Sequence, residues 1–115
     1  MSGDKADVLH GTLDLMILET LEAMGPQHGY SIARRIEQIS HDQLRINQGT
    51  LYPALLKLQH HGWIATKWGE SSTGRRVKSY AITRRGQKQL QVAQGDWQRA
   101  AGIVARFFKL SKGLP

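Results

Sequence analysis

The sequence predicts a mainly α-helical chain with a small β-hairpin and a long final helix. Apolar residues recur at intervals of three and four over most of the chain, as they do on one face of a helix. β-Branched and aromatic residues instead gather in two short runs, which a turn rich in glycine and hydroxyl residues separates. Helices followed by such a hairpin have the outline of a winged helix-turn-helix, here with an added long C-terminal dimerisation helix.

The length of 115 residues suits one packed domain with an appendage and leaves no room for an independent catalytic domain. We expect residues 1–83 to form the winged helix-turn-helix domain, residues 84–110 the dimerisation helix, and residues 111–115 a frayed tail. Cysteine is absent, which excludes disulfides, thiolate zinc sites and cysteine nucleophiles. No apolar run approaches the roughly 18 residues of a membrane span, so we expect a cytoplasmic, nucleoid-associated protein with no membrane contact.

Basic residues are concentrated in the middle of the chain. The formal net charge is +7, and residues 34–88 contain eleven lysines or arginines against three acidic residues. Such a concentration favours a polyanion as partner. A solvated basic face with no role in nucleic-acid binding gives the same composition, so charge alone does not choose between the two interpretations.

Two helices are predicted before the hairpin-forming half of the chain. Thr12 is placed to cap the first helix, which Gly25-Pro26 ends. Its apolar residues with helical spacing are Leu13, Met16, Ile17, Leu21 and Met24. Residues 28–40 form the second helix, with Ile32 and Ile36 on its apolar face. Residues 44–46 are extended enough to add a minor strand.

A third helix is predicted over residues 48–60, with Asn47 as its N-cap and Gly62 as its C-terminal stop. Leu51, Leu55 and Leu58 follow at spacings of four and three and would anchor it in the core. Pro53 lies early in this helix, where its ring should clash with the carbonyl four residues back, so we expect a local distortion near the helix start.

The hairpin is predicted from residues 63–68 and 77–82, with a mobile turn between them. Thr83 would cap the final helix over residues 84–109. At about 1.5 Å per residue this helix is close to 40 Å long, too long for a domain of this size to cover its apolar face. A second copy of the chain is the simplest cover. The predicted dimer stripe is Leu90, Ala93, Trp97, Ala101, Val104 and Phe108.

The start of the third helix carries residues that suit contacts with DNA. Gln48 can pair with adenine, Thr50 can meet a thymine methyl group or a phosphate, and Lys57 can meet a phosphate or guanine. Gly49 allows close approach, and Tyr52 completes the outer face. The alternative is an ordinary polar helix start, with the Tyr52 ring packed between helices.

The hairpin turn supplies a second set of candidate contacts. Arg75, Arg76 and Lys78 lie beside Ser72 and other small residues, and strand alternation puts Arg76 and Lys78 on one face. Cations at this place suit phosphates or the minor groove. A solvated turn is the alternative. A polar helix start followed at this spacing by a basic hairpin favours DNA more strongly than either feature alone.

These segments resemble the PadR family of bacterial transcriptional repressors. The matching residues are Gly11-Thr12-Leu13, His28-Gly29-Tyr30, Gly49-Thr50-Leu51-Tyr52-Pro53-Ala54-Leu55, and Gly74-Arg75-Arg76 with Lys78, Tyr80 and Thr83. The resemblance implies a homodimer on a pseudo-palindromic promoter site, with the first and last helices at the dimer interface. It also implies that Tyr30, Thr50, Tyr52 and the wing cations lie at the DNA surface. The single final helix is similar to that of the family's compact branch.

Trp97 has two interpretations. Some compact members of the family are similar in having a tryptophan on the last helix, where paired indoles stack on flat aromatic compounds. The resemblance therefore implies a small aromatic effector that releases the repressor. The simpler alternative is that Trp97 fills the dimer seam.

Two other classes of function remain to be weighed. An enzyme is disfavoured, because the histidines lack the spacing of a helical metal site and no nucleophile or phosphate-loop motif is present. We therefore expect no cofactor and no metal. A winged helix used for protein or RNA contacts is the other rival, and it would lack preference among duplex sequences.

Overall fold

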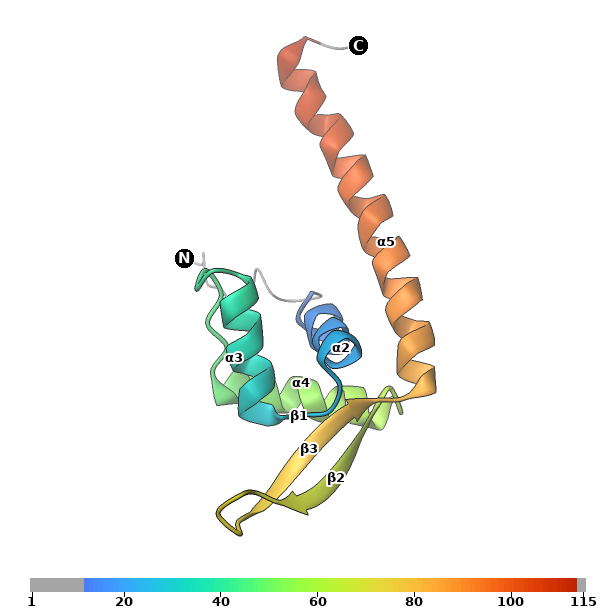
Figure 1. Ribbon diagram of the computed structural model, residues 1–115. Helices are drawn as coiled ribbons and strands as arrows, with labels where there is room; N and C mark the ends of the chain where they lie inside the picture. The colour runs from blue at the N-terminus through green and yellow to red at the C-terminus, as the bar shows by residue number, and fades with distance from the viewer. Residues whose placement is uncertain (1–11, 114–115) are drawn as a thin grey trace.

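The structure, a computed structural model, describes residues 12–113. Three helices pack together, a hairpin extends from one side of them, and a long helix leads away from the domain (Figure 1). The elements are α2 (Leu13–Met24), β1 (Gln27–His28), α3 (Gly29–Ile39), α4 (Gln48–His60), β2 (Ile64–Glu70), β3 (Arg76–Ile82), α5 (Arg84–Phe108) and a final 3₁₀ turn, η1 (Lys109–Lys112). The predicted fold class is confirmed. Gly11 of the first motif lies outside the described residues.

The core lies between the three packed helices and the base of the hairpin. Its largest fully buried side chains are Ile17, Leu18, Leu21, Ile32, Leu51, Leu55, Leu58 and Ile64. The predicted anchor of α4 is therefore buried as its spacing required. Burial of this side of α4 leaves the polar side, including Gln48, exposed.

The sheet has three antiparallel strands in the order β1-β3-β2. The short strand β1 pairs with β3, where Gln27 lies opposite Tyr80 and His28 opposite Ser79. The prediction of a minor strand at residues 44–46 was wrong. Ile46 is buried and its backbone N–H donates to the Glu37 carboxylate, so this segment is held by a side chain and not by a strand partner.

The ends of α4 follow the predicted signals. The Asn47 side chain accepts a hydrogen bond from the Thr50 backbone N–H at 2.9 Å. At the other end, Gly62 has a φ of 76° and donates to the Gln59 carbonyl, while the Trp63 N–H donates to the Leu58 carbonyl. This pair of bonds is a Schellman motif, in which glycine adopts the left-handed conformation at no steric cost. The helix is continuous across Pro53.

The other helix ends agree in part with the predictions. Thr12 occupies the N-cap position of α2 but makes no side-chain capping hydrogen bond there. Thr83 caps α5 as expected, accepting from the Gly86 N–H at 3.0 Å. A frayed tail was predicted from residue 111, but the 3₁₀ turn η1 continues through Lys112. Residues 114–115 lie outside the described part of the chain.

The first half of α5 packs on α2, and the second half projects. Gln87 and Gln94 of α5 donate hydrogen bonds to Glu22 and Glu19 of α2. Beyond these contacts the helix leads away from the domain, and the molecule measures 63 × 31 × 21 Å (Figure 1). The projecting half therefore carries its side chains outside the protomer.

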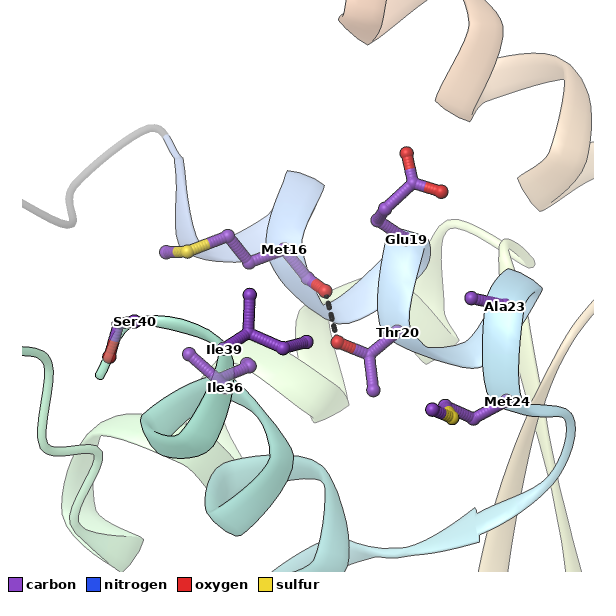
Figure 2. A pocket seen from close by; sticks show the side chains of 8 residues that line it. All are labelled: Met16, Glu19, Thr20, Ala23, Met24, Ile36, Ile39 and Ser40. Carbon is purple, nitrogen blue, oxygen red and sulfur yellow. Dashed lines mark hydrogen bonds between the residues drawn. The ribbon is translucent and has the colours of Figure 1, made fainter. Parts of the chain in front are cut away.

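An apolar groove of about 190 Å³ lies between α2 and the end of α3, and Figure 2 shows the side chains that line it. Its walls come mainly from Met16, Met24, Ile36 and Ile39. The Thr20 hydroxyl donates a hydrogen bond to the Met16 carbonyl at 2.7 Å. The lining residues include no lysine or arginine, so this surface is unsuited to phosphate binding.

Candidate nucleic-acid interface

The N-terminal turn of α4 presents polar groups on a rigid support. Gln48 and Gly49 are exposed, Thr50 is half-buried, and Leu51 behind them is fully buried. The Asn47 cap satisfies the Thr50 N–H and so defines where the helix begins. A helix start of this kind can be inserted into a groove of a duplex without moving apolar groups out of the core.

Two tyrosines flank this turn. Tyr52 of α4 is 41% exposed and Tyr30 of α3 is 66% exposed. The Tyr52 ring leans on the start of α3, where a Cβ added at Gly29 would come within 2.6 Å of its hydroxyl. The ring therefore packs between helices and also keeps an exposed edge, which combines the two interpretations drawn from the sequence.

The tyrosines are shared by two adjoining grooves. One groove, of about 430 Å³, is lined on the α4 side by Asn47 and Gln48 and on the α3 side by Arg34. The other, of about 310 Å³, is lined by Trp68 and Lys78 of the hairpin. Tyr30 and Tyr52 line both. The helix start and the hairpin therefore border one continuous surface.

The turn of the hairpin is held by local hydrogen bonds. The Ser71 N–H donates to the Arg75 carbonyl at 2.8 Å, and Gly74 takes a φ of 81°. Ser71 and Thr73 share a hydroxyl hydrogen bond of 2.9 Å. The predicted mobile turn is thus internally bonded, while Ser72 and Arg75 remain exposed at its surface.

Arg76 and Lys78 lie on the same face of β3, as alternation predicted. Both contact Trp68 across the hairpin: the Arg76 guanidinium carbon is 4.6 Å from the ring centre and the Lys78 ammonium 5.8 Å. Sequence reasoning did not single out Trp68. Trp68 is identified as a neighbour of the two cations once the strand register is known, because that register places it opposite Lys78.

Tyr80 continues this face into the core, where it is 5% exposed. Burial raises the pKa of its phenol, and the charge of the nearby Tyr52 phenolate would raise it further. The neutral form of Tyr80 is therefore the one that the fold stabilises.

Lys57 does not join this cluster. Its ammonium lies 2.5 Å from the Asp14 carboxylate of α2. Lys57 lies nine positions after Gln48, which at about 1.5 Å per residue places them about 13.5 Å apart along the helix. Both partners are partly exposed, so the ion pair contributes little stability but does occupy the lysine.

The pattern of the Transcriptional regulator PadR-like family matches residues 17–92, which make up most of the chain. The chain belongs to this family. A transcriptional regulator from Clostridium thermocellum is 30% identical, with a TM-score of 0.80 over 88% of this chain and 97% of that one. A PadR-like transcriptional regulator from Bacillus cereus is 25% identical, with a TM-score of 0.75 over 90% and 97%. Uncharacterized protein X of Lysinibacillus sphaericus is 27% identical over 91% of this chain and 95% of its own.

Membership confirms the resemblance drawn from the motifs and assigns the PadR-like chain to transcription regulators rather than to enzymes. Within residues 12–113, no cluster of histidine and acidic side chains could hold a metal ion. None of the described helices is long and apolar enough to cross a membrane.

The α5 stripe of the PadR-like chain divides into an inner and an outer part. Leu90 is buried in the core of its own protomer, and Ala93 and Ala101 are half-buried. Trp97 is 53% exposed, and Val104 and Phe108 are also exposed. The sequence prediction missed three further exposed apolar residues at this end of the chain, Ile103, Phe107 and Leu110, because it followed a single stripe.

A hollow of about 290 Å³ adjoins Trp97 and is lined also by Leu15, Gln89, Ala93 and Asp96. The hollow lies between α5 and α2, and its lining includes the Trp97 indole and the Asp96 carboxylate.

Proposed function

We propose that this PadR-like regulator binds double-stranded DNA as a homodimer, recognises a pseudo-palindromic promoter site and represses transcription from it, acting on the nucleoid in the cytoplasm. One observation carries the proposal: the capped polar start of α4 and the cations of the hairpin border the same surface, joined by Tyr30 and Tyr52. A duplex groove and its flanking phosphates need contacts of these two kinds side by side.

In this proposal the start of α4 reads bases. Gln48 is exposed and has the amide that pairs with adenine, and Thr50 offers a methyl and a hydroxyl group. Gly49 lets the backbone come close. Lys57 is the weakest member of the predicted set, because binding a phosphate would require it to leave Asp14.

The hairpin serves as the wing. Ser72, Arg75, Arg76 and Lys78 supply hydroxyl and cationic groups to phosphates, or to a narrow minor groove where the negative potential is strongest. Phosphate contacts set the position of the protein on the duplex, so α4 is brought to a defined register of base pairs.

The dimer is proposed to form through α5. Trp97, Val104 and Phe108 follow at intervals of seven and four, and each is about half exposed or more. Adjacent Ile103 and Phe107 widen this apolar surface. A monomer rarely keeps so large an apolar surface in water, and a second copy with the same stripe can cover it. A two-fold dimer places its half-sites about 34–36 Å apart.

The function is tested by selecting fragments of the source genome with the purified protein and measuring its oligomeric state. We expect a dimer at micromolar concentration and recovery of fragments with inverted half-sites about one helical turn apart. A monomer that retains genomic and random duplexes equally would favour the rival interaction module without operator specificity. If the dimer binds a selected site but does not lower expression of a reporter placed behind that site, the proposed repression is contradicted, while DNA binding as a dimer stands.

The proposed effector is a planar aromatic compound bound at Trp97, because the indole is exposed beside a hollow that has both apolar and polar lining residues. A titration followed by tryptophan fluorescence, with Trp97→Phe as the comparison, tests it. We expect the change in fluorescence to be lost in the variant, and the same compound to release the DNA. An identical response of both proteins would remove Trp97 from the site.

A further inference from the structure

Trp68 carries two cations on one face of the hairpin. The Arg76 guanidinium carbon lies 4.6 Å from the ring centre, and the Lys78 ammonium lies 5.8 Å from it. Both distances are within the roughly 6 Å over which a cation is attracted to an aromatic face. The pairing of Trp68 with Lys78 places Arg76 on the neighbouring diagonal, so the arrangement follows from strand register.

The contacts continue toward the core. The Lys78 ammonium is also 5.7 Å from the centre of the Tyr80 ring, and Tyr80 is buried. Cations and rings therefore alternate from the turn of the hairpin to the core in the order Arg76, Trp68, Lys78, Tyr80. We name these four residues the cation–ring row.

The cation–ring row faces α4, the helix proposed to read bases. Trp68, Lys78 and Tyr80 line the same groove as Tyr30 and Tyr52, and Tyr52 belongs to α4. The neighbouring residue Lys67 lies on the opposite face of β2, since successive side chains of a strand alternate. The row therefore aims its cations at the side of the hairpin from which a duplex seated on α4 would approach.

Holding these cations has a physical consequence for binding. Arginine and lysine side chains have many rotamers, and a ligand that orders them must offset the entropy lost. Arg76 and Lys78 also repel each other, being two positions apart on one strand. Both cations contact the negative face of the indole, which reduces this repulsion and limits their freedom before the ligand arrives.

We propose that Trp68 is a positioning residue, whose ring holds Arg76 and Lys78 in place for the phosphates beside the α4 groove. This inference rests on the proposed function of DNA binding. Trp68 acts through the two cations and not by contacting DNA itself.

The geometry is tested first in the free protein by NMR. Protons of Arg76 and Lys78 next to the cationic groups should resonate upfield of their usual positions, because they lie over the ring face. The upfield shift should vanish in Trp68→Leu, which retains apolar bulk without a ring, and persist in part in Trp68→Phe. The absence of an upfield shift in the unaltered protein would overturn the proposal without reference to DNA.

The consequence is tested with a duplex selected by the unaltered protein. Trp68→Leu should weaken binding roughly three- to ten-fold, as expected for two exposed cation–π contacts. Trp68→Phe should retain most of the affinity that Trp68→Leu loses. In both variants the dependence of affinity on salt should stay nearly the same as in the unaltered protein, because the number of phosphate contacts is unchanged. Lys67→Ala, which removes a cation from the opposite face, is the matched control and should have a smaller effect than Trp68→Leu.

A double-mutant cycle separates positioning from direct contact. In the Arg76→Ala/Lys78→Ala background, adding Trp68→Leu should change affinity by less than about two-fold. An equal loss in both backgrounds would show that the indole contacts DNA itself and would overturn the inference alone. Failure of the unaltered dimer to retain any duplex would overturn the proposed function, and the inference with it.

Discussion

The hydroxyl of Tyr52 lies over Gly29, so close that a Cβ on residue 29 would come within 2.6 Å of the hydroxyl oxygen and 3.0 Å of the ring carbon that bears it. Gly29 is buried and is the first residue of α3. The contact joins the start of α3 to the exposed face of α4. The position of the Tyr52 ring therefore depends on the absence of a side chain at residue 29.

Gly29→Ala should lower DNA affinity by about three- to ten-fold while changing the free energy of unfolding by less than about 1 kcal/mol. The ring end of Tyr52 can swing away, so the clash is relieved by displacing a residue of the proposed DNA surface. Binding and urea denaturation of the same variant measure the two effects. Unchanged affinity would show that the ring position does not matter for DNA.

Gly86→Ala should destabilise the fold by about 1–3 kcal/mol or more. A Cβ at this position would lie 2.0 Å from the Trp63 carbonyl oxygen, a backbone atom that cannot rotate away. The same carbonyl accepts the Thr83 N–H, so displacing it would disturb the junction between the sheet and α5. The midpoint of urea denaturation measures the loss.

Gly95→Ala is the matched control on the same helix. A Cβ there meets the Arg99 guanidinium at an ordinary 3.6 Å, so replacing glycine within α5 should leave stability unchanged or raise it by up to about 1 kcal/mol. Equal destabilisation by both alanines would contradict the assignment of the effect to the Trp63 carbonyl.

Asn47→Ala should cost about 1 kcal/mol of stability, because the Thr50 N–H loses its side-chain acceptor at the start of α4. Asn47→Asp retains an acceptor oxygen and should keep the stability that Asn47→Ala loses. Its negative charge should weaken DNA binding. Thermal unfolding and DNA titration of both variants check the two expectations. Full stability of Asn47→Ala would show that the cap is dispensable.

Most of the fold could be predicted, because helix signals are local: apolar spacing, an N-cap and a stop glycine. The strand Gln27–His28 could not, since two residues show no alternation and the pairing depends on where β3 lies. The position of Lys57 was also beyond local patterns. Its partner Asp14 is on another helix, and only the packing of α2 on α4 brings the two together.

The candidate site divides in the same way. The polar start of α4 and the basic turn were recognisable from residue types and their spacing. The stack of Trp68 with Arg76 and Lys78 depends on hairpin register, which the bonds between Ser71 and Arg75 help to set. The register of the hairpin cannot be predicted from residue types alone.

Alkaline pH should destabilise the protein in part through Tyr80. Burial raises the pKa of its phenol in the folded state, so above the ordinary pKa of about 10 the unfolded chain releases this proton first. The contribution of Tyr80 is thus fully present below that pH and is lost as pH rises through the folded-state pKa. Between pH 9 and pH 11, Tyr80→Phe should therefore lose less stability than the unaltered protein, as measured by urea denaturation. Parallel pH profiles of the two proteins would contradict the assignment.

Gln48→Ala and Arg76→Ala should weaken DNA binding in different ways. Gln48 is exposed at the start of α4, so its removal should alter preference at one or two base pairs by about 1–3 kcal/mol. Arg76 lies on the wing beside Trp68, so its loss should weaken all duplexes and make affinity less dependent on salt. Titrations of the selected site and of single base-pair variants over a salt series measure both. A uniform loss across sequences in Gln48→Ala would show that Gln48 is not a base reader, and an unchanged salt dependence in Arg76→Ala would remove Arg76 from the phosphate contacts.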